Sequence, residues 1–272
     1  MHLLKEFTYL QRPSVKKWGP WWIACALLVV IWSTKLPLPN LQPQPIDLSE
    51  ANAHNRSIPP TITQNVAAIV EGRPLDSYAP LILHFASVLG PEWPIFIFTT
   101  HDEVPKSAAF QRALETKRIW IHRLPDSTDF KNRDAVSEFF TTSWFWEQLA
   151  PAKHVLLFQS DSIICSNSPV NIENFLEYDF VGAPIDPNRG MGDEGMNGGL
   201  SLRNRTTILD IISRHSWKDE LAKAKDRNNP KVRYEDQWYY QRLKEMQHRT
   251  DGGYEARIPT LEAANRFSVE TM

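Results

Sequence analysis

The stretch VLLFQSDSII, residues 155–164, decides the fold prediction. Four apolar residues run directly into Gln159, Ser160 and Asp161 before the chain becomes apolar again. A short apolar run bounded by turn residues is typical of a strand that is buried on both faces. An acid at the end of such a strand is either a turn residue or a group that handles charge in a binding site.

Strand-like and helix-like segments alternate on the N-terminal side of this stretch. The predicted strands are the apolar runs 65–70, 94–100 and 154–159 and the alternating segment 117–124. The predicted helices are 77–90, 107–115 and 135–150, the last as one long amphipathic helix rich in aromatic residues. This alternation indicates a parallel sheet covered on both faces, with ligands bound beyond the carboxyl ends of its strands. Glu71 and Arg73, after the first strand, and Ser160 and Asp161, after the fourth, therefore fall on the ligand edge.

The second half of the chain is less regular. A short helix and a strand are expected within 171–185, and a glycine-rich loop is expected over 188–204. Glycine lets the backbone approach a ligand closely, which makes Asn197, Gly198 and Gly199 candidates for contact with substrate. For residues 190–195, a surface loop without a binding role is an equally good interpretation.

A further helix is predicted over 233–246, and it opens with the adjacent acids Glu235 and Asp236. Acids at the start of a helix commonly just complement the helix dipole. The residue pattern alone therefore favours a structural role for both acids, with a catalytic role as the alternative.

The composition of the 272 residues excludes several classes of protein. A chain that is 42% hydrophobic and 23% charged is expected to fold rather than to be disordered. The net charge of -2 and the lack of a basic repeat give no electrostatic case for a nucleic-acid partner. The sequence has no GxGxxG after its first strand and no P-loop motif, which disfavours a dinucleotide-binding domain and a P-loop NTPase.

The N-terminal part predicts a membrane anchor. Residues 18–34, WGPWWIACALLVVIWST, contain no charge and would form a helix of roughly 25 Å, near the lower limit for spanning a bilayer. More basic residues precede this run than follow it, so residues 1–17 are predicted to be a cytosolic tail and the remainder to be luminal. A cleaved signal peptide and a buried helix are the alternatives, although the run ends without an obvious cleavage site.

Residues 35–60 are rich in proline and polar residues and are interpreted as an extended stem. The stem contains Asn55 in a sequon for N-glycosylation. An anchor, a stem and a globular domain over 61–272 are typical of a single-pass type II protein. The short anchor favours the thin membranes of the ER or Golgi.

Together, these segments resemble the GT-A glycosyltransferases and, more closely, a largely fungal and poorly characterised family of glycosyltransferase-like proteins. The matching segments occur in order from residue 65 to residue 272: NVAAIVEGRP, PEWPIFIFTT, VLLFQSDSIIC, EYDFVGAPI, MNGGLSLRN, YEDQW and RFSVETM. The resemblance implies a GT-A-like, mixed and mostly parallel α/β sheet flanked by helices. It also implies a nucleotide-sugar donor and a glycan or glycoconjugate acceptor.

The resemblance implies roles for residues at the ligand edge. GT-A enzymes carry a DxD motif whose acids hold a divalent metal on the donor diphosphate, and here the motif reads Gln159-Ser160-Asp161. Asp161 would therefore be the metal ligand, for Mn²⁺ or Mg²⁺, because one carboxylate can suffice alongside phosphate and water. Glu71, Arg73 and Ser160 would contact the nucleotide.

The resemblance also implies roles in the second half of the chain. Asn197, Gly198 and Gly199 would line the side where donor and acceptor meet. Glu235 and Asp236 match an xED motif, whose acid serves as the base in inverting GT-A enzymes. For Asp236 the resemblance outweighs the purely structural interpretation.

The chain departs from the family pattern in two places. Gln159 replaces the first acid of the motif, and the sequence ends at Met272, where related chains continue into a segment with a histidine suited to metal binding. These departures leave open a C-terminally truncated catalytic domain and a second hypothesis, an inactive, membrane-tethered glycan-binding or scaffold protein. A glycoside hydrolase, which needs two opposed carboxylates, fits the pattern less well. Retention and inversion are not distinguished.

Overall fold

The computed structural model describes residues 62, 64–125, 127–128, 130, 132–185, 195–224, 226–248 and 252–269, all within one unit, Pro45–Met272. The predicted tail, anchor and stem, the sequon at Asn55, and the first part of the predicted glycine-rich loop lie outside the described residues. Among the residues that are described, no helix is long and apolar enough to cross a membrane.

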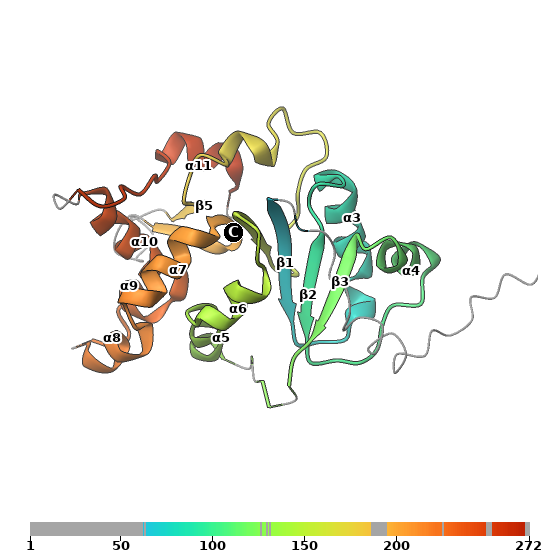
Figure 1. Ribbon diagram of the computed structural model, residues 1–272, viewed down its shortest axis with the longest axis horizontal. Coiled ribbons are helices and arrows are strands. Elements are labelled where there is room, and N and C mark those ends of the chain that lie inside the picture. The colour runs from blue at the N-terminus through green and yellow to red at the C-terminus, as the bar shows by residue number, and fades with distance from the viewer. Residues whose placement is uncertain are drawn as a thin grey trace, which may run out of the picture. The chain divides into compact units, whose positions relative to one another are not determined.

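A six-stranded mixed sheet forms the centre of this unit (Figure 1), with the strand order β3-β2-β1-β4-β6-β5. The strands are β1 (Asn65–Glu71), β2 (Ile95–Thr99), β3 (Ile119–Arg123), β4 (His154–Phe158), β5 (Phe180–Ile185) and β6 (Gly195–Asn204). Strands β1 to β4 are parallel, whereas β6 is antiparallel to both of its neighbours. The predicted α/β class with a mixed, mostly parallel sheet is thereby confirmed.

The central strands explain why the sequence shows unbroken apolar runs. Both β2 (IFIFT) and β4 (HVLLF) are buried along their whole length, as expected of strands covered on both faces. The register pairs Glu71 with Thr99 and Ala68 with Leu157, so the carboxyl ends of β1, β2 and β4 lie at one edge of the sheet.

Helices pack on both faces of the sheet. On one face, Phe85 of α3 (Ala79–Leu89) stacks on Phe158, with 3.9 Å between the ring centres. On the other face, Phe145 of α6 (Ser143–Gln148) lies 4.9 Å from the ring centre of Phe98. The remaining helical elements are η1 (Leu75–Ser77), α4 (Ala108–Glu115), α5 (Arg133–Phe140), η2 (Ile172–Phe175), α7 (Arg205–Arg214), α8 (Trp217–Lys223), α9 (Pro230–Arg233), α10 (Glu235–Gln247) and α11 (Leu261–Phe267).

The prediction of one long helix over 135–150 is wrong, because α5 ends and α6 begins anew within it. The hydroxyl of Thr141 donates to the carbonyl of Ser137 at 2.7 Å, and the hydroxyl of Thr142 donates to the carbonyl of Phe139 at 2.8 Å. Such bonds give the last carbonyls of α5 partners other than helical amides, which favours a helix end.

The prediction of a loop over 188–204 is wrong for its second half, where residues 195–204 form β6. The pairing with β5 passes from Gly182–Ser201 to Ala183–Asn197, so residues 198–200 have no partner in β5. This is a β-bulge, a feature that often re-aims backbone next to binding sites. The glycines that suggested a loop therefore serve an irregular strand.

Candidate functional site

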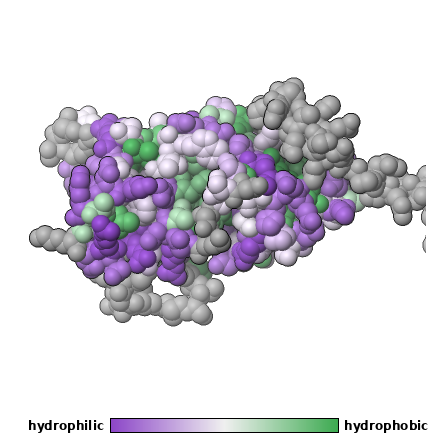
Figure 2. All heavy atoms as spheres, turned by 90° about the horizontal axis from the view of Figure 1, so that it is seen from below, coloured by the Kyte–Doolittle hydropathy of each residue, from purple (hydrophilic) through white to green (hydrophobic). Residues whose placement is uncertain are grey.

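The carboxyl ends of β1 and β4 carry the first group of predicted site residues. The buried carboxylate of Glu71 accepts hydrogen bonds from Nε and Nη2 of Arg73, both at 2.8 Å. Nη2 also donates to Oγ of Ser160 at 2.7 Å, just beyond β4. The structure thus brings Glu71, Arg73 and Ser160 together and holds one guanidinium across two strand ends. Figure 2 looks onto this edge, where hydrophilic residues dominate and hydrophobic residues show in smaller areas between them.

Asp161 follows Ser160 and is exposed to solvent. The hydrogen bond that Arg73 donates to Glu71 raises the pKa of Arg73, against the opposing effect of burial, and the negative charge of Asp161 adds to the rise. Arg73 is therefore a permanent cation beside Asp161. Glu71 already balances that cation, so Asp161 is an exposed carboxylate at this edge that an incoming ligand would meet.

The donor set around Asp161 determines whether a divalent cation fits. Within the described ranges, no three His, Cys, Asp or Glu side chains come together as a metal site. Glu71 is already engaged by Arg73. Magnesium is often held by one or two carboxylates together with phosphate and water oxygens, and Asp161 fits that pattern only when a phosphate is also bound. Metal binding by Asp161 therefore stays a prediction.

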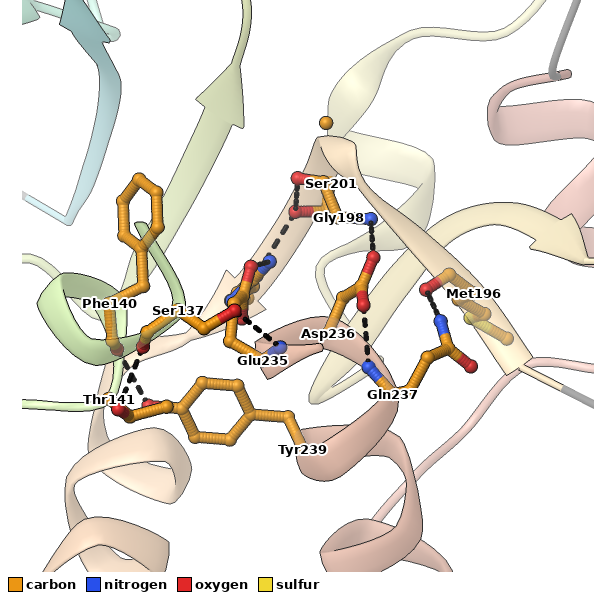
Figure 3. A network of polar contacts seen from close by, with 12 residues as sticks. Ser137, Phe140, Thr141, Met196, Gly198, Ser201, Glu235, Asp236, Gln237 and Tyr239 are labelled. Carbon is orange, nitrogen blue, oxygen red and sulfur yellow. Dashed lines mark hydrogen bonds and ion pairs between the residues drawn. The ribbon is translucent and has the colours of Figure 1, made fainter. Parts of the chain in front are cut away.

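The second group of predicted residues lies where β6 meets the start of α10 (Figure 3). The amide of Gly198 donates to Oδ2 of Asp236 at 2.9 Å, and the amide of Gln237 donates to Oδ1 at 2.7 Å. Within the NGG segment (residues 197–199), the amide of Gly199 donates to Oδ1 of Asn197 at 2.7 Å. Asp236 therefore ties the NGG segment to α10.

The two glycines of the NGG segment are closely packed, and Gly198 is the more tightly enclosed, because its neighbour Arg203 is fully buried whereas Gln159 beside Gly199 is exposed. A Cβ atom on Gly198 would lie 2.6 Å from Nη2 of Arg203 and 2.8 Å from Cβ of Asp236. A Cβ atom on Gly199 would lie 2.7 Å from Oε1 of Gln159, just beyond β4. The carbonyl of Gly199 also accepts a hydrogen bond from Oγ of Ser162 at 3.1 Å. The loop after β4 thus connects the two groups of site residues.

Glu235 has a different environment from its neighbour Asp236. Nη1 of Arg203 contacts Oε2 of Glu235 at 2.8 Å, and Nη2 contacts Oε1 at 3.0 Å. Arg203 is fully buried, and its guanidinium lies 4.8 to 5.8 Å from the ring centres of Phe180, Tyr239 and Trp146. Because both of its oxygens are engaged by this cation, Glu235 is an ion-pair partner, and Asp236 is the more exposed acid of the pair.

Asp236 has the proton affinity of a base that works near neutral pH. Burial raises the pKa of Asp236 to about 6, the charge of Glu235 adds to the rise, and the amide of Gly198 and the charge of Arg203 oppose it. The side chain is packed among protein atoms but keeps partial exposure to solvent. A carboxylate of this kind is mostly ionised at pH 7 and still accepts a proton readily.

A cavity of about 90 Å³ lies beside the NGG segment and Glu235, and its lining does not include Asp161 or Asp236. Its walls are mostly apolar, and its polar lining comes from Gln159 and Glu235. The apolar residues are Val70, Phe130, Val136, Phe140, Leu157 and Phe158, and the backbone of Gly198 and Gly199 completes the wall. This volume accommodates a small substituent rather than a whole nucleotide sugar.

Sequence reasoning missed Arg203 and Ser201, which lie directly beneath the site. One signal was available: in the run LSLR, residues 200–203, Leu200 and Leu202 fall on one face of a strand, and Ser201 and Arg203 fall on the other. A polar face within an otherwise buried strand indicates a polar network. Its main partner, Glu235, follows 32 residues later, so no local pattern connects the two.

Several solved structures are similar to this chain, each at low identity. They include the galactosyltransferase LgtC with donor and acceptor sugar analogs (14% identity, 61% of this chain and 68% of that chain, TM-score 0.35). Another is the glycosyltransferase GlyE of Streptococcus pneumoniae TIGR4 (15% identity, 66% of this chain and 43% of that chain, TM-score 0.39). A third is the mannosyltransferase PcManGT of Pyrobaculum calidifontis in complex with GDP-Man and Mn²⁺ (9% identity, 60% of this chain and 52% of that chain, TM-score 0.35).

No curated protein matches the chain. A family described as "Protein of unknown function (DUF5672)" matches residues 118–272, which is more than half of the sequence. That match begins just before β3 and includes Asp161, the NGG segment and both acids of α10. Whether the family is largely fungal, as predicted, stays untested. The chain belongs to the DUF5672 family of proteins of unknown function.

Proposed function

We propose that this chain is a glycosyltransferase that moves a sugar from a nucleotide-sugar donor to a glycan or glycoconjugate acceptor. The observation that carries the proposal is Asp236, a partly exposed acid with a pKa of about 6 that is held against the NGG segment. The NGG segment in turn contacts the loop after β4, which carries Asp161. Both groups belong to the sheet edge where open α/β proteins bind ligands, and the sequence resemblance to GT-A enzymes supports the same role.

In this proposal, Asp236 accepts the proton of the acceptor hydroxyl while that oxygen attacks the anomeric carbon of the donor. The bond from the anomeric carbon to the diphosphate oxygen breaks, and its electron pair leaves with the diphosphate. Arg73 and Ser160, held together at the strand ends, bind the donor phosphates. Asp161 would hold Mn²⁺ or Mg²⁺, which when bound supplies positive charge against the leaving diphosphate.

Transfer assays with a panel of nucleotide sugars and Mn²⁺ test this proposal. Wild-type protein should release nucleoside diphosphate, and Asp161→Ala should lower the rate by about tenfold or more, because a lost carboxylate ligand weakens a site that has few protein ligands. Glu115→Ala, which removes an exposed acid at the end of α4, is the matched control and should leave the rate unchanged. An unchanged rate in Asp161→Ala would refute the metal assignment.

A second candidate function is that of an inactive glycan-binding or scaffold protein tethered to a membrane. Two observations favour it: Gln159 replaces an acid of the family motif, and Arg73 already engages Glu71. Calorimetry with nucleoside diphosphates and Mn²⁺ separates the two functions. A transferase binds them at the β1–β4 edge, whereas a scaffold has no need to.

We further propose that residues 18–34 anchor the chain in the ER or Golgi membrane, as a single-pass type II protein whose C-terminal domain is luminal. The support is the uncharged, tryptophan-flanked run and the basic residues that precede it. Alkaline carbonate extraction tests the anchor, and release of the protein into the supernatant would refute it. Treatment with an endoglycosidase should increase the gel mobility of wild-type protein but not of Asn55→Gln, which tests luminal placement.

A further inference from the structure

Arg203 connects the parts of the second group of site residues. Besides its pair with Glu235, its Nε donates to Oγ of Ser201 at 3.0 Å, and that hydroxyl donates to the carbonyl of Gly198 at 2.9 Å. The amide of Gly198 donates to Asp236, which is covalently joined to Glu235. These contacts close a ring of interactions between β6 and the start of α10, and Figure 3 shows Ser201, Gly198, Asp236 and Glu235 facing one another within it.

We propose that Arg203 is a positioning residue that holds Glu235 and the carbonyl of Gly198 so that the Asp236 carboxylate stays directed toward the acceptor. This role rests on the proposed function, in which Asp236 is the base. Arg203 itself touches no substrate, because its side chain is fully buried beneath the NGG segment.

The geometry of this ring requires arginine. The guanidinium uses three nitrogens to bind two oxygens of Glu235 and the hydroxyl of Ser201 at the same time. The planar fork of arginine can meet all three acceptors, whereas the single ammonium of lysine cannot meet them in the same plane. The three aromatic rings around the guanidinium leave little room for another arrangement.

Two charges act on Asp236 in opposite directions. Glu235, on its own helix, raises the pKa of Asp236, whereas Arg203, from β6, lowers it. Charged residues of the other elements packed against α10 have partners of their own. They include Asp134 and Arg233, which pair at 2.9 Å, Glu138 with Lys218 at 2.7 Å, and Asp210 with Arg214 at 2.8 Å. Arg133 lies over the ring of Tyr234, and Nε of Arg205 donates to the carbonyl of Ala152 at 2.6 Å.

The test compares two substitutions in the full chain that should move the protonation of Asp236 in opposite directions. Glu235→Gln removes the negative neighbour and should shift the acid limb of the kcat/KM profile to lower pH. Arg203→Met removes the positive neighbour and should shift that limb to higher pH, each by about one pH unit. Titration of the Asp236 carboxyl carbon by NMR, assigned with Asp236→Asn, reads the same shifts without any turnover.

Two further variants separate positioning from charge and from general stability. Arg203→Lys keeps the charge but loses the fork, so the limb should stay in place while kcat decreases about tenfold or more, because the base is misplaced. Arg214→Met removes an arginine from an exposed pair with Asp210 and should leave both the limb and kcat unchanged.

Opposite displacements in Glu235→Gln and Arg203→Met, with the limb unmoved but kcat lowered in Arg203→Lys, support the proposal. An unchanged kcat in Arg203→Lys would overturn the positioning role. If Arg203→Met does not fold, Glu235→Gln and Arg203→Lys still decide the matter. A carboxyl titration and an acid limb that do not move in Glu235→Gln would overturn it. If the carboxyl titrates as expected but no nucleotide sugar serves as donor, the proposed function fails, while the control of Asp236 by these two neighbours stands.

Discussion

Replacing Gly198 with alanine is expected to destabilise the protein by about 1–2 kcal/mol, and the structure gives the reason. The added Cβ would lie 2.6 Å from Nη2 of Arg203, 2.8 Å from Cβ of Asp236 and 3.0 Å from Oε1 of Glu235. Arg203 is fully buried, so it cannot swing into solvent to relieve the contact.

The magnitude follows from two opposing effects. Overpacking of a buried site costs about 1–3 kcal/mol, while a glycine-to-alanine change restricts the unfolded chain and returns about 0.4–1 kcal/mol. For a domain of this size each kcal/mol shifts the melting temperature by about 2–4 °C, which makes the expected decrease roughly 2–8 °C.

Thermal unfolding followed by circular dichroism measures this decrease. Gly72→Ala is the matched control, because its Cβ would meet only a side-chain carbon of Phe130 at an ordinary 3.4 Å, and its melting temperature should stay close to that of the wild type. A melting temperature for Gly198→Ala within about 1 °C of the wild type would show that the NGG segment is not packed tightly on the Arg203 pair.

Two further predictions concern the end of the sheet opposite the site. Asp179→Asn should lower the free energy of unfolding by about 2 kcal/mol in urea titrations, because the buried carboxylate accepts hydrogen bonds from Thr207 Oγ1 (2.6 Å), Tyr254 Oη (2.9 Å) and the Arg257 amide (2.8 Å). Retained stability would mean that Asp179 does not fasten the C-terminal segment. Burial, and then the charge of Lys153, lowers the pKa of His154. As the pH falls, the unfolded chain therefore binds this proton before the folded protein does. The free energy of unfolding of the wild type should decrease below about pH 6.5 for this reason. In His154→Gln, the free energy of unfolding should decrease less steeply between about pH 7.5 and 5.5.

The strands were predictable because each buried strand is a short apolar run. The apolar runs at 65–70, 94–100 and 154–159 correspond to β1, β2 and β4, which are almost entirely buried, and the alternating segment 117–124 corresponds to the edge strand β3, whose residues are mostly half-buried. The break between α5 and α6 was not predictable from apolar periodicity, which continues across Thr141 and Thr142. Their hydroxyls end the helix through local hydrogen bonds that a periodic pattern does not register.

The exposed residues of the site could be predicted from the sequence, but the buried residues that hold them in place, Arg203 and Ser201, could not. Asp161 lies just after the end of a strand, and the acids of α10 lie at the start of a helix; both boundaries can be recognised in the sequence. The NGG segment suggested a loop, because its glycines were interpreted as a sign of backbone freedom. In the structure, Gly198 packs so closely on the buried Arg203 that no space is left for a Cβ. The partner of Arg203 lies on another element, and only the tertiary fold brings the two together.

The central claim is that the chain transfers sugar from a nucleotide donor with Asp236 as the base. The most direct measurement compares wild-type protein with Asp236→Asn for transfer across a panel of nucleotide sugars, with nucleoside diphosphate affinity measured in parallel. The account predicts transfer by the wild type from at least one donor, and a loss of about a hundredfold or more in Asp236→Asn while the affinity stays within about threefold, because general-base catalysis contributes factors of this size. Equal transfer by the two proteins, or none from any donor by the wild type, would contradict it.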